Sequence, residues 1–170
     1  MHINEVSKLK GFGNYQVDTR MFDLDKKLKE WIKEDGLELN PYFQRGHVWS
    51  NDQKIEFVEF ILKGGTCPPL VFNHPGWLGS FDGKFYCVDG LQRISAILAF
   101  LNGELAVFKG HYRQDIEGMD KELKRIHVKI FINNLKNDRE VLDWYLELNG
   151  GGTPHTQDEL SRVKALRDKL

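Results

Sequence analysis

Apolar residues recur at three- and four-residue steps in several parts of the chain, which is the spacing of an amphipathic helix. The first predicted helix runs from about Asp23 to Glu34 and stops before Gly36, a residue suited to a helix C-terminus. Its apolar face comprises Leu24, Leu28, Trp31 and Ile32. The same spacing predicts helices from Ser50 to Gly64, Leu91 to Asn102, Asp138 to Leu148 and Thr156 to the C-terminus.

Polar residues before three of these helices are typical of helix N-termini. Ser50 precedes Gln53 by three positions, and Thr156 precedes Glu159 in the same way. In such a capping box each side chain accepts a hydrogen bond from the other residue's backbone N–H group. Asp138 is the predicted cap of the helix that ends near Leu148.

Short apolar runs between the helices predict the strands of a small sheet. The runs are PPLVF at 68–72, KFYCV at 84–88 and HVKIFI at 127–132, with LELNP at 37–41 as a short extended piece. Asp82-Gly83 is a tight-turn signal that suits either a loop or a hairpin between the first two runs. A weak helix is indicated at 120–125. These elements predict an α+β fold, with a small mixed sheet surrounded by about five helices.

The composition is that of a soluble globular protein. With 170 residues, 41% of them hydrophobic and 29% charged, the chain is long enough for one core and short for two, so residues 1–170 are expected to form a single domain. No apolar run reaches the length of a membrane span, and the N-terminal segment lacks the apolar core of a secretion signal. We therefore expect a cytoplasmic protein without a membrane partner. The net charge of -1 provides no global field that attracts nucleic acid.

Cysteine and histidine spacing gives no sign of a metal centre. Cys67 and Cys87 lie in apolar surroundings without CxxC spacing, which predicts buried free thiols. The six histidines form no HxH or HxxxH pair, so no zinc site is evident and most are expected in loops or at the surface.

Residues 88–93, VDGLQR, place three polar side chains in the turn between a strand and a helix. In one interpretation they are structural: Asp89 caps the helix, Gly90 permits a positive φ, and Gln92 and Arg93 are solvated. In the other, the N–H groups at the helix start bind phosphate oxygens and Arg93 clamps them. Asp89 would then hold Mg²⁺ or orient a water, and Gln92 would position the nucleophile or a leaving oxygen. That chemistry suits a phosphoanhydride or a phosphodiester.

Two further segments allow a structural or a functional interpretation. PYFQRGHVWS at 41–50 is either a loop pinned to the core by Tyr42, Phe43 and Trp49, or a tightly fixed loop that holds Arg45 as an anion ligand. LNGGGTPHTQDEL at 148–160 is either a flexible hinge or a loop whose backbone N–H groups approach phosphates. No GK[ST] follows the glycines, which excludes a P-loop.

The order of these three segments resembles the GmrSD N-terminal-domain family, within the broader ParB/sulfiredoxin-like group. In that family an xYQRxxVW loop, a DGQQR turn and an LNxGGxxLxxxEL segment recur in this order, and the resemblance here spans roughly residues 37–165. It implies a ParB-like fold in which the DGQQR turn is the nucleotide site. It also implies NTP binding and hydrolysis, and a link to DNA restriction or phage defence.

The resemblance extends to individual residues. The positions that match nucleotide or phosphate ligands are Gln44, Arg45, Gly90, Arg93, Asn149, Gly151 and Thr153. The positions that match catalytic residues are Asp89, Gln92 and Arg93, with Asp89 as the expected Mg²⁺ ligand. The sequence departs from the family pattern at Leu91, which replaces the first glutamine of the turn, and at Pro154-His155. Loss of that amide removes a water-positioning group and bears more on hydrolysis than on binding.

Three functions follow as alternatives. The first is a nucleotide-binding domain, possessing or lacking Mg²⁺-dependent NTP hydrolysis, that serves restriction, defence or another DNA transaction. Because relatives commonly carry a further domain, its partners would be an NTP, DNA and a separate effector or nuclease protein. The second is a non-catalytic module that binds DNA or protein on the same fold. The third is a stand-alone nuclease or nickase. The protein would be an enzyme if the nucleotide-binding domain hydrolyses NTP, or if the nuclease alternative holds.

Local basic and aromatic groups are the candidate contacts for DNA. Lys and Arg residues gather at 121–129 and 162–169, but acidic residues or an amphipathic pattern accompany them, which favours a solvated face. Trp77 in the loop before KFYCV would stack on a base, meet a protein partner, or fold onto its own core.

Overall fold

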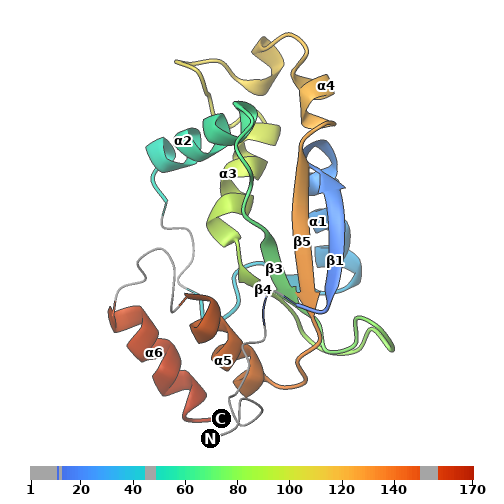
Figure 1. Cartoon of the computed structure of the whole chain (residues 1–170), viewed down its shortest axis with the longest axis vertical. Helices are drawn as coiled ribbons and strands as arrows, with labels where there is room; N and C mark the ends of the chain where they lie inside the picture. Colours follow the sequence, from blue (N-terminus) through green and yellow to red (C-terminus); the bar gives the residue numbers. More distant parts are fainter. Residues whose placement is uncertain (1–10, 12, 45–48, 150–156) are drawn as a thin grey trace, which may run out of the picture.

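The computed structural model describes residues 11, 13–44, 49–149 and 157–170, and these form a mixed sheet with helices on both faces (Figure 1). The strands are β1 (Tyr15–Arg20), β2 (Leu37–Glu38), β3 (Leu70–Asn73), β4 (Phe85–Asp89) and β5 (His127–Asn133). The helices are α1 (Leu24–Glu34), α2 (Asn51–Leu62), α3 (Leu91–Leu101), α4 (Met119–Leu123), α5 (Asp138–Asn149) and α6 (Gln157–Arg167). Two short 3-10 helices span Met21–Asp23 and Arg113–Asp115.

The sheet has five strands in the order β1-β5-β3-β4-β2. β5 pairs in parallel with β3, and β4 pairs in parallel with β2, whereas β1 with β5 and β3 with β4 are antiparallel. The predicted α+β class and mixed sheet are therefore confirmed. The antiparallel pairing of β3 with β4 makes their connection, which contains Asp82-Gly83, a hairpin rather than a crossover.

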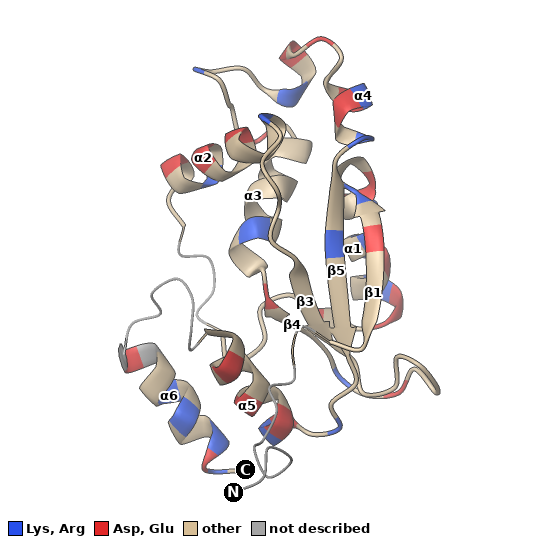
Figure 2. Ribbon diagram, in the orientation of Figure 1, with Lys and Arg blue, Asp and Glu red and all other residues tan. Residues whose placement is uncertain are grey.

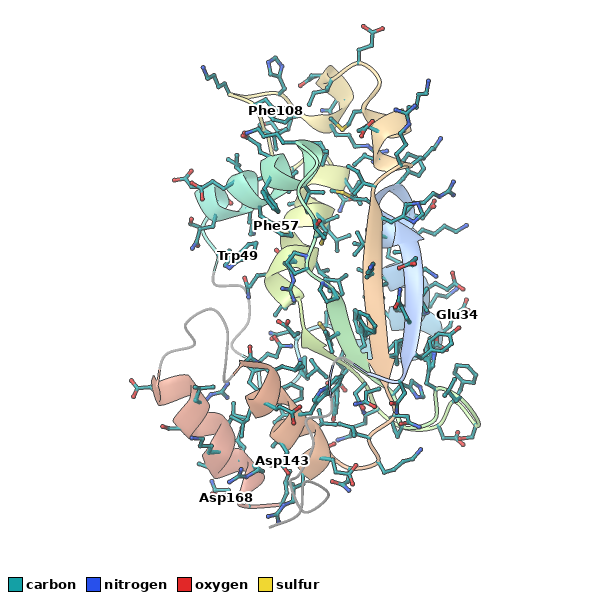
Figure 3. All side chains as sticks on the ribbon, viewed as in Figure 1. Glu34, Trp49, Phe57, Phe108, Asp143 and Asp168 are labelled. Carbon is teal, nitrogen blue, oxygen red and sulfur yellow. The ribbon has the colours of Figure 1, made fainter. Side chains whose placement is uncertain are left out.

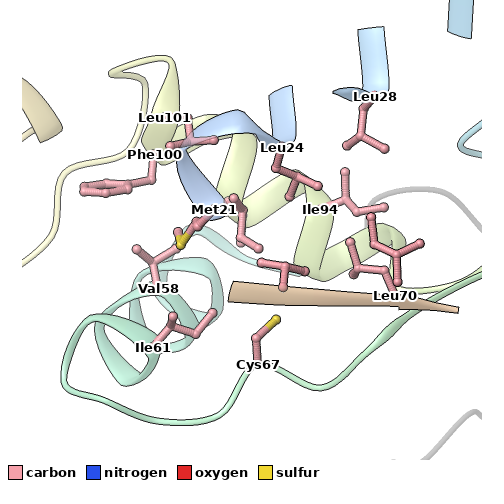
Figure 4. Packing of buried hydrophobic residues seen from close by; sticks show 14 of the residues in the cluster. Met21, Leu24, Leu28, Val58, Ile61, Cys67, Leu70, Ile94, Phe100 and Leu101 are labelled. Carbon is pink, nitrogen blue, oxygen red and sulfur yellow. The ribbon is translucent and has the colours of Figure 1, made fainter. Parts of the chain in front are cut away.

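Alternate side chains of β3 and β4 enter two separate hydrophobic clusters, as the pleat of a strand requires. Phe72 and Cys87 join the larger cluster, which α1, α2 and α3 complete and part of which Figure 4 shows. Val71 and Val88 join the smaller cluster, formed with Phe43 and residues of α5 and α6. The strand-to-helix turn after β4 thus lies between helices that pack on opposite faces of the sheet.

Local capping signals were confirmed where the structure describes them, with one correction. Ser50 Oγ accepts the Gln53 N–H at 3.3 Å, and Gln53 Oε1 accepts the Ser50 N–H at 2.9 Å. Thr156 lies outside the described residues, so the structure does not describe the predicted Thr156–Glu159 box. The prediction of Asp138 as a cap was wrong, because Asn137 Oδ1 accepts the N–H of Glu140, three residues later, at 3.0 Å. Asp138 is the first residue of α5.

Two features of the fold were not predicted from the hydrophobic pattern. β1 was not predicted, because its outward-facing residues are polar and only Val17 and Thr19 turn inward. It reaches the sheet as an edge strand alongside β5. Ile32 was assigned to the buried face of α1 but is 44% exposed, since it lies farther around the helix than Leu28 and Trp31. Among the described residues, no helix is both long and apolar enough to cross a membrane.

Candidate functional site

The VDGLQR turn adopts a backbone conformation that requires glycine. Gly90 has a φ of +118°, and a Cβ at this position would lie 2.7 Å from Leu70 Cδ2. A side chain here would therefore meet both an unfavourable backbone angle and the packed start of β3. The sequence-based expectation of a positive φ at Gly90 is confirmed.

Gly90 also leaves the start of α3 without a side-chain cap. The first backbone hydrogen bond from inside the helix runs from the Ile94 N–H to the Gly90 carbonyl at 2.8 Å. This bond closes the first turn, so the helix itself supplies no acceptor to the N–H groups that come before it. This end of the 11-residue helix carries the positive end of the helix dipole.

Asp89 and Arg93 form an ion pair across this turn. Arg93 Nη2 donates to Asp89 Oδ2 at 2.6 Å and to the Pro69 carbonyl at 3.2 Å. The Arg93 side chain is 17% exposed and that of Asp89 is 39% exposed, so the pair is partly screened from water. Arg93 Nε is buried and has no acceptor in the described part of the chain. The pair ties the start of α3 to the segment that enters β3, and Arg93 neutralises the Asp89 carboxylate.

The three segments 41–50, 88–93 and 148–160 are the first, second and third motifs. Two glutamines attach the described parts of the first motif, 41–44 and 49–50, to the VDGLQR turn. Gln44 Nε2 donates to the carbonyl oxygens of Cys87 at 2.6 Å and Val88 at 3.2 Å. On the other side, Gln92 Oε1 accepts the Trp49 N–H at 3.1 Å. The first and second motifs are therefore joined by side-chain hydrogen bonds at the end of β4 and the start of α3. Arg45 and the rest of 45–48 lie outside the described residues.

Aromatic packing supports the same junction. Phe43 is 1% exposed and packs edge-on against Tyr86 of β4 and Tyr145 of α5. Trp49 lies against Phe57 of α2, with 5.2 Å between ring centroids (Figure 3). Phe43 and Trp49 thus anchor the loop as the structural interpretation expected. Tyr42 is not buried in the core, since it is 46% exposed, and its ring packs edge-on against Phe43 and Tyr86.

The Tyr42 hydroxyl instead donates to Asp138 Oδ2 at 3.3 Å. Desolvation and the nearby Asp138 carboxylate raise the pKa of Tyr42 to about 12. Asp138 therefore links the first motif to the start of α5 rather than capping that helix.

The third motif meets the first through α6. Asn149, at the end of α5, donates from Nδ2 to the Tyr145 carbonyl at 2.7 Å, while Gly151 and Thr153 lie outside the described residues. Beyond them, Arg162 Nη2 donates to the Phe43 carbonyl at 2.8 Å and the Gln44 carbonyl at 3.4 Å. In the sequence, Arg162 stands out only as part of the basic stretch 162–169. The pattern of α6 alone carries no signal for this contact, because its acceptors are backbone atoms.

The two cysteines beside the turn are free and buried, as predicted. Burial raises the pKa of Cys67 to about 11 and also raises the pKa of Cys87 well above its usual range. Both thiols therefore stay protonated and unreactive near neutral pH.

The described residues do not form a ready-made Mg²⁺ site. Across the described ranges, no group of three or more His, Cys, Asp or Glu side chains is arranged to hold a metal ion. The Asp89 carboxylate, the expected ligand, is paired with Arg93. A hard cation that needs about six oxygen ligands would have to draw most of them from a bound phosphate compound and from water.

The other candidate contacts behave as ordinary surface or core groups. In 121–129, Arg125 pairs with Glu122, and in 162–169, Arg167 pairs with Asp143 and Asp168. Figure 2 shows acidic residues beside the basic ones in α4, and at the start of α6 and just after its end. Trp77 folds onto the protein's own core, with 5.5 Å between its ring and that of Trp31.

The three motifs lie within a range of the chain that matches a known family. The family model described as "GmrSD restriction endonuclease, N-terminal domain" matches residues 28–166. The chain belongs to this family. The matched range of this GmrSD N-terminal domain covers all three motifs and every α-helix except the start of α1 and the end of α6, while β1 and the 3-10 helix Met21–Asp23 precede it. Comparisons with curated proteins and with solved structures gave no match.

Proposed function

We propose that this GmrSD N-terminal domain acts as one ParB-like unit in the cytoplasm and binds the phosphates of a nucleoside triphosphate at the start of α3. The observation that carries the proposal is the uncapped first turn of α3, held between both described ends of the first motif by Gln44 and Gln92. The positive end of the helix dipole at this turn, with N–H groups for which the helix itself supplies no acceptor, stabilises an anion.

Positive side chains would complete the phosphate site. Arg45 directly follows Gln44 in the sequence, and Arg93 lies in the first turn of α3. The guanidinium of Arg93 keeps donors beyond the Nη2 bonds to Asp89 and Pro69. Further proposed ligands in the third motif are Asn149, Gly151 and Thr153.

The biological setting that we propose is DNA restriction or phage defence, because the matching family is described by a restriction endonuclease. In this role the domain would act on DNA with a separate effector or nuclease protein. The basic residue of α4 lies between acidic ones, and in α6 Arg162 and Arg167 are engaged in contacts within the chain. Recognition of DNA would therefore depend on the partner or on local contacts rather than on a broad positive face.

Hydrolysis is the second part of the proposal, with Asp89 orienting the water and Gln92 aligning its attack. A non-catalytic module is the competing function, and specific contacts favour it. The Asp89 carboxylate accepts a hydrogen bond from Arg93, and Gln92 Oε1 accepts one from the Trp49 N–H. Leu91, which replaces a family glutamine, is 3% exposed and packs in the core. Mg²⁺ would accompany the nucleotide as a charge-neutralising ion held mainly by its phosphates.

Nucleotide binding is tested by thermal unfolding with ATP, GTP, CTP or UTP in the presence of Mg²⁺. A ligand that binds only the folded state stabilises it by about 2.7 kcal/mol at one hundred times its Kd. We expect one or more nucleotides to raise the Tm, and inorganic phosphate at equal concentration to do so less. If all four leave the Tm unchanged at millimolar concentration, nucleotide binding is wrong.

Turnover is tested by phosphate release from the nucleotide that binds, with and without duplex DNA. Release that Asp89→Asn abolishes while binding persists supports hydrolysis. Binding without release supports the non-catalytic module. Metal-dependent cutting of supercoiled plasmid by the purified chain alone would instead support the nuclease alternative.

A further inference from the structure

Arg162 connects α6 to the first motif by its side chain. Its Nη2 atom lies 2.8 Å from the Phe43 carbonyl oxygen and 3.4 Å from the Gln44 carbonyl oxygen. These residues are more than one hundred positions apart in the sequence. A charged guanidinium holding backbone carbonyls forms stronger hydrogen bonds than a neutral donor does.

Hydrophobic packing holds α6 in place beside this contact. Val163, the residue after Arg162, is 1% exposed and belongs to the same cluster as Phe43 and Tyr145. Arg167, farther along α6, pairs with Asp143 of α5. Arg162 is therefore presented to the first motif from a helix that is anchored directly after it, at Val163 and Arg167.

Gln44 is held from two directions. Arg162 binds its backbone carbonyl, and its own side-chain amide binds the Cys87 and Val88 carbonyls at the end of β4. A continuous series of polar contacts thus runs from α6 through residue 44 to the strand that ends at Asp89. The next residue in the sequence is Arg45, a proposed phosphate ligand.

We propose that Arg162 is a positioning residue: it couples the helix after the glycine-rich third motif to the loop of the first motif, and so organises the ligand site at the start of α3. The effect on the ligand site rests on the nucleotide binding proposed above. The coupling of α6 to the first motif does not depend on it. It does not require Arg162 to touch the ligand.

The coupling is tested without any ligand by hydrogen–deuterium exchange of peptides that cover residues 41–50. Arg162→Ala should speed exchange in this segment, while peptides from β5 remain unchanged. Arg162→Lys should restore part of the protection, because a lysine ammonium also donates to carbonyl oxygens. Lys164→Ala is the matched control, since Lys164 is an exposed cation on the same helix, two residues along. Unchanged exchange in 41–50 for Arg162→Ala would overturn the coupling.

The consequence for the site is tested by calorimetry with the nucleotide that raises the Tm most. We expect binding at least about tenfold weaker in Arg162→Ala, which corresponds to ~1.4 kcal/mol, with intermediate affinity for Arg162→Lys and unchanged affinity for Lys164→Ala. Faster exchange with unchanged affinity would contradict the positioning role.

The proposal stays testable if no nucleotide binds or if Arg162→Ala does not fold. If the wild type binds none of the four nucleotides, the proposed function fails, and the exchange experiment alone decides whether Arg162 orders the loop. If Arg162→Ala does not fold, Arg162→Gln and Arg162→Lys carry the comparison. In that case equal exchange in 41–50 for wild type, Gln and Lys variants overturns the proposal.

Discussion

Gln44 and Cys87 lie 43 positions apart in the sequence, yet Gln44 Nε2 donates a 2.6 Å hydrogen bond to the Cys87 carbonyl oxygen. This bond joins the first motif to the C-terminal end of β4, close to the VDGLQR turn. Together with the bond from the Trp49 N–H to Gln92, it makes the motif glutamines structural as well as candidate ligand residues. The first motif is therefore held in place by the second before any ligand binds.

The Gln44 contact predicts a sharp difference between two small substitutions. Gln44→Glu replaces an amide donor by a carboxylate facing two carbonyl oxygens, and we expect it to lower the free energy of unfolding by about 1–3 kcal/mol at neutral pH. Urea denaturation measures the loss. Gln114→Glu, at an exposed position of the 3-10 helix Arg113–Asp115, is the control and should change stability by less than about 0.5 kcal/mol. A Gln44→Glu variant as stable as the wild type would show that the amide is not engaged in solution.

The Asp89–Arg93 pair predicts energetic coupling. In a double-mutant cycle with Asp89→Ala and Arg93→Ala, we expect an interaction energy of about 1–3 kcal/mol from chemical denaturation, because each single variant leaves a partly buried charge without its partner. The exposed Arg20–Asp23 pair, also at 2.6 Å, is the control. Its coupling should be only about 0.2–1 kcal/mol and should weaken in salt. Equal coupling in both cycles would mean that burial contributes nothing at the turn.

Alanine substitutions at Gly90 and Gly36 distinguish the cost of a steric clash from the cost of a left-handed backbone. Both have positive φ, but a Cβ at Gly90 would lie 2.7 Å from Leu70, whereas nothing lies within 4 Å at Gly36. We expect Gly36→Ala to cost about 1–2 kcal/mol of unfolding free energy, the price of the left-handed backbone alone. Gly90→Ala should cost more, and the excess measures the clash with Leu70. The same loss at both positions would show that the turn relaxes freely.

His74 predicts loss of stability in acid. It is fully buried, its Nδ1 accepts the Gly76 N–H at 3.1 Å, and its Nε2 has no partner among the described atoms. Desolvation lowers its pKa below the ordinary 6.5, although the Asp35 and Asp82 carboxylates oppose the shift. The unfolded chain therefore binds the proton more readily, and His74's contribution to stability is present above pH 6.5 and is lost as the pH falls below it.

Thermal unfolding between pH 7.5 and 5 measures this effect. His74→Phe should flatten the decline of Tm with acid, because phenylalanine has no proton to gain. Substitution of the exposed His127 by Gln should leave the decline as it is in the wild type. An unchanged pH profile in His74→Phe would assign the acid sensitivity to other groups.

The sequence by itself determined the elements whose causes are local. Helix periodicity, the Ser50–Gln53 capping box and the glycine at the VDGLQR turn depend on residues within about four positions of one another. The three ordered motifs also identified the family without any coordinates, because the order and spacing of residues are themselves sequence properties. Buried cysteines followed from their apolar neighbours.

The tertiary structure decided what depends on distant partners. β1 became a strand because β5 offered it an edge, and Ile32 stayed exposed because it lies at the margin of the face of α1 that Leu28 and Trp31 bury. The acceptors of Gln44 and Arg162 are backbone carbonyls, which every residue type carries, so no sequence pattern marks them. Hydrogen-bond partners of this kind exist only once packing on both faces of the sheet has brought the loop, the turn and α6 together.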